Sequence, residues 1–567
     1  MNRRTFVKLS TAALCACPAV GAVALQHAIS PKPEWLQKLI QVNDQRLKAL
    51  QAYRVADEKS PAFGGFLDGT DIPNPHSTVG FIRTAICALV SEESEFYKSK
   101  QIKTETEQAL TYLLKIQHAD GTLDLLSTNF HSTPDTGFIV KWTAPLHTLL
   151  RQADAVFFEP TLGLLQTFLK RAGESLIVGG IHTPNHRWVV SAALGALYQL
   201  WPDVRYAQRA EQWLAEHIDM DEDGQYNERS TYIYSPLTNR VLITIARTLN
   251  KPELYEYVRK NLAMTLYYIH PNGEVVTEAS GRQDKAAVGN MDGYYYAYRY
   301  MALRDSDGTF AAMCREIEQT VLDKVAGHLS YFLEDQTLWR ELPAAKKLPV
   351  NYVRTFPRSG LVRIRRNEWD ATLISNNPVW LTFHKGNAIL QGMRVAASFF
   401  GKGQFETETI TQQGTDWLMT RRLEGPYYQP LSKEKIRDDG DWEKMPRSGR
   451  KQSEVQVMTT TIVIRERGNG LEIDLKLEGT DGVPVALELI FREGTFKGVQ
   501  SLGTGKEVFL LPDNSTGTCT VGSHTLTFGP GRAAHKAVQL RGALPAMNAP
   551  TVYLTGFTPF IHTLRIS

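Results

Sequence analysis

Apolar residues recur with helical spacing from Pro31 to about Leu342. They stand at positions i, i+3 or i+4, and i+7, which is the spacing of the buried face of an amphipathic helix. Roughly ten or eleven segments carry this pattern, and short turns join them. Examples are EWLQKLIQVNDQRLKALQAY, ETEQALTYLLKIQ, PTLGLLQTFLKRA and RWVVSAALGALYQLW. Residues 31–342 are therefore predicted to form irregular helical hairpins in an (α/α) toroid or incomplete barrel. A superhelical solenoid is the alternative, although no strict repeat period is visible.

Three joints between these segments share one pattern. Asp120-Gly121, Asp223-Gly224 and Asn272-Gly273 each follow an amphipathic segment. Glycine tolerates a positive φ, so each joint is predicted to turn the chain sharply after a helix.

After about Asn351 the period changes to two. Segments such as VWLTFHKG, QVMTTTIVIRERGNGLEIDLKLEG, TCTVGSHTLTFGPG and KAVQLRG are rich in Thr, Val and Ile and are bounded by turn residues. Many strands without intervening helices predict an antiparallel β-sandwich over residues 350–567. Arg467-Gly468-Asn469-Gly470 predicts a hairpin. The fold class is thus α+β multidomain, and the boundary falls in PAAKKLPV, near Leu342–Pro349.

The first residues predict export. MNRRTFVKLSTAALCACPAVGAVALQ contains Arg3-Arg4 and a short run of small apolar residues that ends in Ala22-Val23-Ala24. Residues 1–24 therefore resemble a twin-arginine signal peptide, and we expect a periplasmic protein. A lipoprotein modified at Cys17 and an uncleaved anchor are the alternatives.

Length and charge narrow the classes of function. The 567 residues, 43% of them hydrophobic, exceed what one core needs, so two or more domains are expected. Cleavage after Ala24 removes Arg3, Arg4 and Lys8, which balances the 63 basic and 60 acidic residues. The neutral mature chain does not indicate nucleic acid or a membrane surface, and it contains no membrane span. Its three scattered cysteines do not suggest a disulfide framework or a thiol metal site.

The stretch GGIHTPNHRWVV places His182, Asn185, His186, Arg187 and Trp188 at the start of a predicted helix. Asn185 is expected as the N-cap, with the helix running from His186 to about Leu200. A helix start suits a carboxylate, and its dipole favours a neutral imidazole. The plainer interpretation is that Asn185 only caps while the histidines are surface groups.

Two further groups of polar residues follow. NERSTYIYSP supplies Tyr232 and Tyr234, with Arg240 just downstream. A tyrosine can act as a general acid or, once deprotonated, as a general base; alternatively both are half-buried rim aromatics. EASGRQDKAA is a loop that can grip sugar hydroxyls or a carboxylate, or can simply be solvated. Its candidate ligands are Glu278, Arg282, Gln283 and Asp284.

Two histidines complete the candidate set. His131 lies in STNFHSTPDTGF before a helix, together with Asn129 and Asp135. His384 and Lys385 lie at a strand end in the second half, where His384 is a candidate contributor or a plain rim histidine.

Several motifs are excluded. Asp219, Asp221, Asp223 and Gly224 match the first half of a calcium loop, but Ser230 stands where a glutamate is required, so an acidic turn is the better interpretation. The chain has no HExxH, no Gly-rich phosphate motif and no GxSxG, which sets aside metalloproteases, NTPases and α/β-hydrolases.

A helical toroid, an antiparallel sandwich, Asn185-His186 at a helix start and tyrosines some fifty residues later resemble polysaccharide lyases of the heparinase II/III and alginate lyase type. The resemblance is greatest to the rhamnose–glucuronate lyases that act on arabinogalactan side chains. It implies β-elimination on a uronic-acid-containing glycan, giving a 4,5-unsaturated uronate. The family's asparagine and histidine would be Asn185 and His186, its tyrosine Tyr232 or Tyr234, and its sandwich histidine His384.

The resemblance also implies roles. Asn185 with Arg240 or Arg282 would neutralise the carboxylate, His186 or an ionised tyrosine would take the C5 proton, and Tyr234 or Tyr232 would protonate the leaving oxygen. Trp188 and Tyr294 to Tyr296 are candidate sugar platforms. FHKGN lacks the second histidine and the aspartate often found in the family. No cofactor is expected to be required, and neither a structural Ca nor a structural Zn is predicted.

Two other classes of function stay open. An inverting glycosidase needs two carboxylates, for which Glu278 with Asp284, or Asp135 with Glu228, are available. A non-catalytic glycan-binding protein is the third interpretation. The sequence does not determine the oligomeric state.

Overall fold

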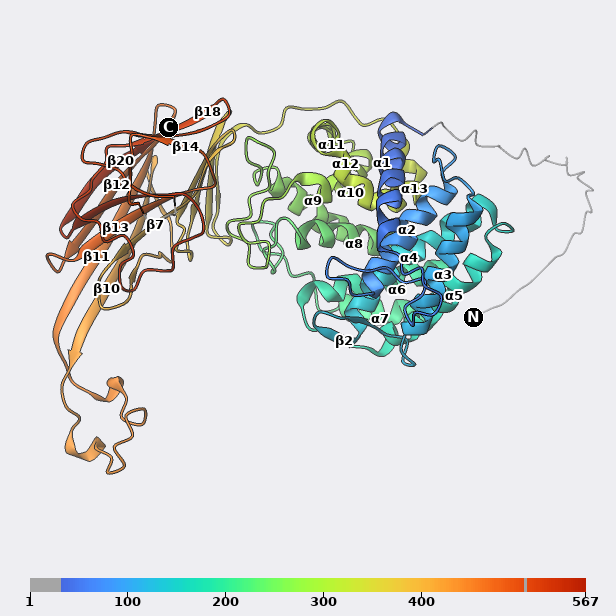
Figure 1. Ribbon diagram of the computed structural model, residues 1–567, viewed down its shortest axis with the longest axis horizontal. Coiled ribbons are helices and arrows are strands. Elements are labelled where there is room, and N and C mark those ends of the chain that lie inside the picture. Colours follow the sequence, from blue (N-terminus) through green and yellow to red (C-terminus); the bar gives the residue numbers. More distant parts are fainter. Residues whose placement is uncertain (1–31, 504–506) are drawn as a thin grey trace, which may run out of the picture.

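The structure, a computed structural model, describes residues 32–503 and 507–567. The predicted signal peptide of residues 1–24 lies outside this part of the chain. Helices occupy the first half and β-sheets the second, and the two halves lie side by side along the long axis (Figure 1). The predicted fold class, a helical toroid followed by an antiparallel sandwich, is confirmed. No helix in the described ranges is long and apolar enough to cross a membrane.

The helical half forms a closed double ring. The helices are α1 (Glu34–Leu50), α2 (Pro75–Val90), α3 (Lys100–Ile116), α4 (Thr133–Asp154), α5 (Glu159–Val178), α6 (Pro184–Leu200), α7 (Val204–Leu214), α8 (Tyr234–Thr248), α9 (Leu254–Thr265), α10 (Tyr295–Asp305), α11 (Gly308–Thr320), α12 (Leu322–Val325) and α13 (Leu329–Glu334). Helices α2, α4, α6, α8 and α10 pack in succession, while α3, α5 and α7 form an outer row. The ring closes because α12 and α13 pack against α1 and α2. The inner α4 and α6 are buried along most of their length, whereas the outer α7 buries only Tyr206 and Ala210.

The three predicted joints have one backbone geometry. Gly121, Gly224 and Gly273 have φ values of 85°, 93° and 83°. In each joint the glycine N–H donates to the carbonyl three residues earlier, which closes a turn. The expectation of a positive φ after a helix is therefore confirmed at all three.

The second half consists of two facing sheets. One has the order β14-β17-β18-β20-β12-β11-β10-β9 and the other β15-β16-β19-β13-β7-β6-β5-β4-β3, with β8 paired to β7. Of the pairings in the described sheets, only β16 with β19 is parallel. The strands are β3 (Asn351–Phe356), β4 (Leu361–Arg366), β5 (Trp369–Ile374), β6 (Leu381–Lys385), β7 (Ala388–Ala397), β8 (Gly403–Gln404), β9 (Thr411–Gln413), β10 (Asp416–Tyr428), β11 (Gln452–Arg467), β12 (Gly470–Gly479), β13 (Pro484–Phe491), β14 (Thr495–Lys497), β15 (Gln500–Ser501), β16 (Val508–Leu510), β17 (Gly517–Val521), β18 (His524–Gly529), β19 (Thr551–Phe557) and β20 (Phe560–Ile566). A separate pair, β1 (Leu123–Leu125) and β2 (Asn129–Ser132), precedes α4.

Successive side chains of a strand point to opposite faces of the sheet, so every second residue enters the core of the sandwich. Residues such as Trp380, Met393, Ile462 and Leu564 are fully buried between the sheets. The predicted hairpin is confirmed, since Arg467 pairs with Gly470 across Gly468-Asn469. The strand expected in KAVQLRG is wrong: residues 536–542 form no strand, and Leu540 packs with Tyr553 in a small separate cluster. The segment between β10 and β11 projects away from both halves (Figure 1).

Buried polar contacts join the halves. Arg363 of β4 is fully buried and donates through Nε to the Tyr267 carbonyl and through Nη2 to Asp370 at 3.0 and 2.6 Å. The acidic turn after α7 also contacts the sandwich. The Ser359 N–H donates to Asp223, and Arg358 forms an ion pair with Glu222. The acidic turn predicted at residues 219–224 thus contacts the second domain.

Candidate functional site

Helix α6 begins at Pro184, two residues after His182. Thr183 occupies the N-cap position, and Pro184 is the first helical residue. The expectation that Asn185 caps the helix is therefore wrong. Proline's fixed φ suits the first helical position, so the helix starts before Asn185, whose side chain is free for another contact.

That contact is with Glu228, in the segment that precedes α8. The Asn185 Nδ2 atom donates to Oε1 of Glu228 at 2.6 Å, and the Asn185 backbone N–H donates to the same oxygen at 3.3 Å. Both side chains are buried, with exposed fractions of 3% and 8%. Since Nδ2 has two hydrogens, the bond to Glu228 leaves one for a ligand.

His186 lies one residue further along the first turn. Its ring meets His182 edge-on at 4.7 Å and Phe138 of α4 at 6.0 Å. Burial, followed by the neighbouring His182 and by Arg282, lowers the pKa of His186 to about 4. The imidazole is therefore neutral near pH 7 and can accept a proton.

Tyr234 approaches the same place from α8. Its hydroxyl accepts a hydrogen bond of 2.7 Å from Gln283, and the Arg282 guanidinium lies 5.2 Å from the centre of its ring. Arg282 Nε also lies 3.7 Å from Oε2 of Glu228. The structure thus links Asn185, Glu228, Arg282 and Tyr234 in one continuous set of contacts, with His186 within electrostatic range of Arg282.

This group contains several buried polar atoms without a partner. Asn185 Oδ1, His186 Nδ1, Glu228 Oε2 and Arg282 Nε are all buried and make no hydrogen bond. Glu228 Oε2 and Arg282 Nε face each other at 3.7 Å, which is an ion pair but too long for a hydrogen bond. Buried polar atoms normally make hydrogen bonds, so this group of exceptions indicates a place where a polar ligand or water binds. We call these residues, with Tyr234 and Gln283, the Asn185 cluster.

Arg187 and Trp188 lie outside the Asn185 cluster. Trp188 is only 1% exposed and donates through Nε1 to Asp219 at 2.9 Å, so it belongs to the core and is not a sugar platform. Arg187 pairs with Glu216 and Asp219 at 3.2 and 3.1 Å. Both residues face α7 and the acidic turn, because a helix directs successive side chains to different sides.

Asp284 and Tyr232 also make contacts that stabilise the fold. Asp284 is 1% exposed and accepts from Ser230 and from the Tyr232 backbone N–H, so it braces the loop and is not open to a sugar. The Tyr232 ring lies against Gly289, where an added Cβ would meet the ring at 2.3 Å. Tyr234, and not Tyr232, contacts the Asn185 cluster.

The remaining predicted ligands are dispersed. His131 is exposed, bonds to Asp120 at 2.7 Å and stacks on His118 beside the β1–β2 pair. Arg240 donates to the Gly293 carbonyl and makes no hydrogen bond or ion pair with the Asn185 cluster in the described residues. Tyr294, Tyr295 and Tyr296 are at most 1% exposed and are core residues, which corrects their assignment as platforms.

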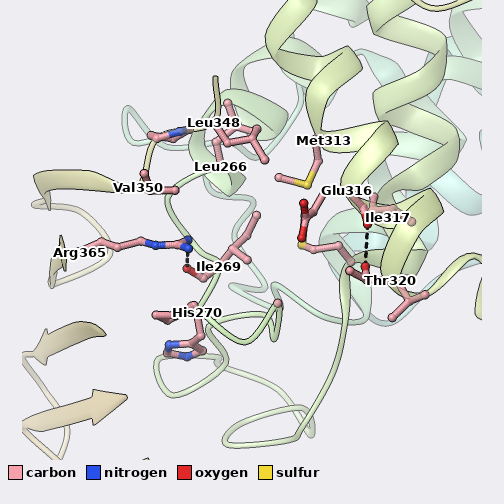
Figure 2. Close-up of a pocket in the computed structure, with 15 residues that line it drawn as sticks. Leu266, Ile269, His270, Met313, Glu316, Ile317, Thr320, Leu348, Val350 and Arg365 are labelled. Atoms are coloured by element: carbon pink, nitrogen blue, oxygen red, sulfur yellow. Dashed lines mark hydrogen bonds between the residues drawn. The ribbon is translucent and has the colours of Figure 1, made fainter. Parts of the chain in front are cut away.

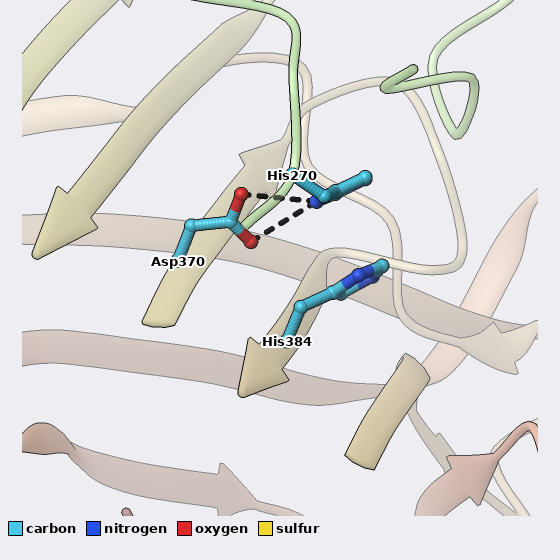
Figure 3. A group of neighbouring side chains, drawn as sticks. All are labelled: His270, Asp370 and His384. Atoms are coloured by element: carbon cyan, nitrogen blue, oxygen red, sulfur yellow. Dashed lines mark hydrogen bonds and ion pairs between the residues drawn. The ribbon is translucent and has the colours of Figure 1, made fainter. Parts of the chain in front are cut away.

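His384 and Glu278 meet at the boundary between the halves, in a cluster that the sequence did not predict. His270, which follows α9, stacks on His384 with ring centres 3.7 Å apart and planes 7° apart. His270 Nδ1 lies 3.0 Å from both oxygens of Asp370 (Figure 3). The other ring nitrogen, Nε2, lies 3.3 Å from Glu278. His384 Nε2 lies 3.8 Å from Glu278. No contact joins His384 to Asn185 or His186 in the described structure.

Charges balance in this boundary cluster. Burial lowers the pKa of His270, but the carboxylates of Asp370 and Glu278 outweigh it and raise the pKa to about 9. Burial and the charged His270 lower the pKa of His384 to about 3. Although burial opposes it, His270 and Arg363 hold the pKa values of Asp370 and Glu278 well below their usual range. Two cations therefore face two carboxylates, with His384 neutral.

The boundary cluster does not fit a metal ion as it stands. His270, Asp370 and His384 each place one ligand atom within 4.8 Å of the others. A metal bound by imidazole lies in the ring plane at about 2.0–2.1 Å from nitrogen. Rings that are parallel to within 7° and 3.7 Å apart have no common plane in which one ion can lie. Arg363 also occupies Asp370 already, at 2.6 Å.

A small cavity of about 120 Å³ adjoins the boundary but is mostly apolar. Leu266, Met313, Ile317 and Leu348 line it, and Arg365 reaches the Ile269 carbonyl at its edge (Figure 2). It contains no residue of the Asn185 cluster, so we do not assign it as the site.

The carboxylates that a glycosidase mechanism would use all make hydrogen bonds or ion pairs with other residues. Asp284 braces its loop and Glu278 joins the boundary cluster. Asp135 accepts from Ser132 and Asn129, and Glu228 accepts from Asn185. The sequence had identified Glu228 only as a possible acid. Its contact with Asn185 spans 43 positions and carries no local signal.

Comparisons with known proteins support the fold. No family model and no curated protein matches the sequence. The structure is similar to a crystal structure of heparinase III, with a TM-score of 0.54 and 11% identity over 95% of this chain and 85% of that one. It is also similar to a Streptomyces coelicolor A3 chondroitin AC lyase in complex with chondroitin sulphate (TM-score 0.53, 12% identity, 94% and 80% covered). A Paenibacillus xanthan lyase matches with a TM-score of 0.55 and 10% identity, over 94% of this chain and 57% of the lyase. The chain thus shares the toroid-and-sandwich fold of these polysaccharide lyases.

Proposed function

We propose that this protein is a polysaccharide lyase that cleaves a uronic-acid-containing glycan by β-elimination. The observation that carries the proposal is the Asn185 cluster, in which an amide, a neutral imidazole, a guanidinium and a phenol meet with unpaired buried atoms. Fold alone does not determine chemistry, but the same fold in heparinase III, chondroitin AC lyase and xanthan lyase supports this class of reaction.

Neutralising the substrate carboxylate is the first requirement. Removal of the C5 proton places negative charge beside that carboxylate, so donors must stabilise both. Asn185 supplies its second Nδ2 hydrogen, and Arg282 supplies a positive charge and an Nε–H that makes no hydrogen bond within the described protein. The N-terminus of α6 adds its dipole.

His186 acts as the base and Tyr234 as the acid. The neutral His186 imidazole takes the C5 proton through a ring nitrogen. As the C5 electron pair forms the C4–C5 double bond, the C4–O bond breaks and the leaving oxygen takes the Tyr234 proton. The products are a 4,5-unsaturated uronate and a chain with a free hydroxyl, and the two side chains return to their starting states by exchanging protons with water.

The reaction itself provides the test. Mature protein is incubated with glucuronate-capped arabinogalactan, heparan, chondroitin and alginate, and ultraviolet absorbance and product mass are followed. We propose the rhamnose–glucuronate linkage of arabinogalactan as the preferred substrate. A lyase produces an absorbing conjugated double bond. A mass gain of one water without absorbance identifies a hydrolase, and intact substrate identifies a binding protein.

We also propose that the chain is exported through the twin-arginine route and works without a cofactor. Residues 1–24 fused to a reporter that folds before transport test the first point, with Arg3→Lys and Arg4→Lys combined as the control. Export that survives the double change contradicts the proposed route.

A further inference from the structure

A group of cationic side chains lies inside the helical ring, apart from the residues used above. Arg46, Arg83, Lys141 and Arg240 come from α1, α2, α4 and α8, and His328 ends the short 3₁₀ helix at Ala326–His328. They belong to elements that are far apart in sequence and meet because the ring closes.

Lys141 is the most buried of them. Its side chain is only 4% exposed, and its Nζ atom lies 4.6 Å from the centre of the Trp142 ring and 5.4 Å from that of Phe138. Arg83 approaches the same Trp142 ring at 5.1 Å. Two cations therefore lie over the same aromatic ring, which stabilises each only partly.

These cations have no close counter-ion. Among residues 32–503 and 507–567, no carboxylate lies within 4.0 Å of a charged nitrogen of Arg46, Arg83, Lys141 or Arg240. Lys141 and Arg83 make no side-chain hydrogen bond in the same ranges, and Arg240 makes one, to a backbone carbonyl. Like charges buried together without an anion destabilise a fold, so the arrangement is understandable if an anion binds there.

Neighbouring groups confirm that the charges act on one another. Burial, Arg240 and Arg83 hold the pKa of Lys141 well below its usual value. Burial and the charges of Arg46, Arg83, Lys141 and Arg240 lower the pKa of His328, so this histidine joins the group as a neutral imidazole, and its Nδ1 atom is buried without a hydrogen bond. Asp292 is the carboxylate that acts on Arg240, together with the hydroxyls of Tyr331 and Tyr294.

The cluster is open on one side. A cavity of about 450 Å³ lies between α1, the loop at Phe66–Gly69 and α2, and both Arg46 and Arg83 line it. Ser77 and Thr84 add hydroxyl groups, and Arg46 is exposed at the rim. Asp68 also lines the cavity, but its carboxylate accepts hydrogen bonds from Thr70 and Ile72 of its own loop. An anion can therefore reach Arg83 from solvent.

The cluster also lies next to the Asn185 cluster. Phe138 touches both, since its ring faces His186 at 6.0 Å and the Lys141 ammonium at 5.4 Å. Phe138, Lys141 and Trp142 share one face of α4 through their i, i+3 and i+4 spacing. One ligand chain can therefore contact both places.

We infer that Arg46, Arg83, Lys141, Arg240 and His328 form an anion-binding site that takes a second carboxylate or a sulfate of the bound glycan. The identity of the ligand rests on the proposed lyase function, whereas anion binding itself does not. Carboxylate and sulfate share the charge and the acceptor oxygens that guanidinium and ammonium groups bind.

Anion binding is tested without any glycan. The whole mature protein is titrated calorimetrically with sodium sulfate and, separately, with sodium acetate at constant ionic strength. We expect saturable binding of at least one anion, weakened tenfold or more by Lys141→Met and by Arg83→Gln. Lys170→Met is the matched control, because Lys170 also lies over a tryptophan ring, at 5.4 Å from Trp201, but on the exposed surface. No saturable binding by the wild type, or equal binding by Lys141→Met, overturns the inference. If Lys141→Met does not fold by circular dichroism, Arg46→Gln decides: threefold weaker binding supports the site and unchanged binding overturns it.

The glycan arm distinguishes the two proposals. KM is compared for oligosaccharides with one carboxylate, with several carboxylates, and with sulfates. In the wild type, multiple anionic groups should lower KM at least tenfold, and Lys141→Met should bring this ratio close to one while Lys170→Met retains it. A ratio that Lys141→Met leaves unchanged overturns the inference. Anion binding without cleavage of any glycan supports the site and contradicts the lyase, whereas cleavage without anion binding supports the lyase and contradicts the site.

Discussion

Asn185 and Glu228 are joined by a buried hydrogen bond of 2.6 Å that ties the first turn of α6 to the segment before α8. The carboxylate holds the amide in place, and it leaves one Nδ2 hydrogen and the buried Oδ1 atom of Asn185 without a hydrogen bond. The buried Glu228 side chain therefore holds the Asn185 amide in position. Substitution of Asn185 is the most direct test of the site.

Asn185→Ala should lower kcat/KM by about 100-fold or more, the usual loss on removing one donor to developing charge. Steady-state rates on the best glycan measure the effect. Asn129→Ala is the matched control, because Asn129 also donates its amide to a carboxylate, that of Asp135, at 3.0 Å. Equal losses in both variants would show that Asn185 has no special role.

Tyr234→Phe removes the proposed acid while keeping the ring that lies beside Arg282. General acid catalysis contributes about 100-fold or more, so kcat should fall by at least that factor while the melting temperature stays close to wild type. Tyr232→Phe should retain most activity, because that ring packs against Gly289. A loss in Tyr232→Phe that matches or exceeds the loss in Tyr234→Phe would reverse the assignment.

The pH profile follows from His186. The base must be neutral, and its pKa is lowered to about 4, so kcat/KM should hold from neutral pH down to near 4 and fall tenfold per pH unit below it. The unfolded chain binds this proton from about pH 6.5 downward, so stability declines between 6.5 and 4 even while the folded enzyme stays active. Circular dichroism at each pH corrects for this decline. An acid limb near 6.5 would contradict a buried neutral His186.

Arg363 offers a stability test at the boundary between the halves. Arg363→Met leaves Asp370 buried beside His270 alone, and breaking such a buried pair costs about 3–5 kcal/mol. Arg366→Met, which breaks a half-exposed pair with Glu466, should cost only about 0–1 kcal/mol. Urea unfolding of both variants measures the difference, and similar costs would show that the Arg363 pair is no more important than a surface pair.

Removal of metal ions with a chelator tests the proposal that the protein works without a metal. Because the stacked His270 and His384 rings share no plane, we expect dialysis against a strong chelator to change neither the rate nor the melting temperature. Elemental analysis of the purified protein gives an independent measurement. A loss of activity that added zinc or calcium restores would refute the proposal.

The fold could largely be predicted from the sequence, because helices and strands each show a characteristic spacing of hydrophobic residues. The helical spacing, the glycine joints at Gly121, Gly224 and Gly273, and the Gly468-Asn469 hairpin all depend on neighbours in sequence. The strand expected near Leu540 failed because a short alternating run forms a strand only where a partner edge is free to pair with it.

The site was less accessible because its contacts are distant in sequence. Asn185, His186 and Tyr234 were identified as candidates, but the bond from Asn185 to Glu228 and the meeting of His270 with Asp370, 100 positions later, have no local signal. Trp188 was predicted as a sugar platform and Asp284 as a sugar ligand, yet both are buried. Composition alone does not distinguish a polar loop braced by its own carboxylate from one that faces solvent.

The buried contact of Arg363 and His270 with Asp370 has a mechanical consequence. A hinge between the two halves would pull His270 away from Asp370 and would also break the bonds from Arg363 to the carbonyls of Tyr267 and Ile269, which leaves buried charges uncompensated at a cost of several kcal/mol. The toroid and the sandwich therefore keep a fixed orientation relative to each other. We therefore expect that a glycan of the proposed class binds without separation of the two halves.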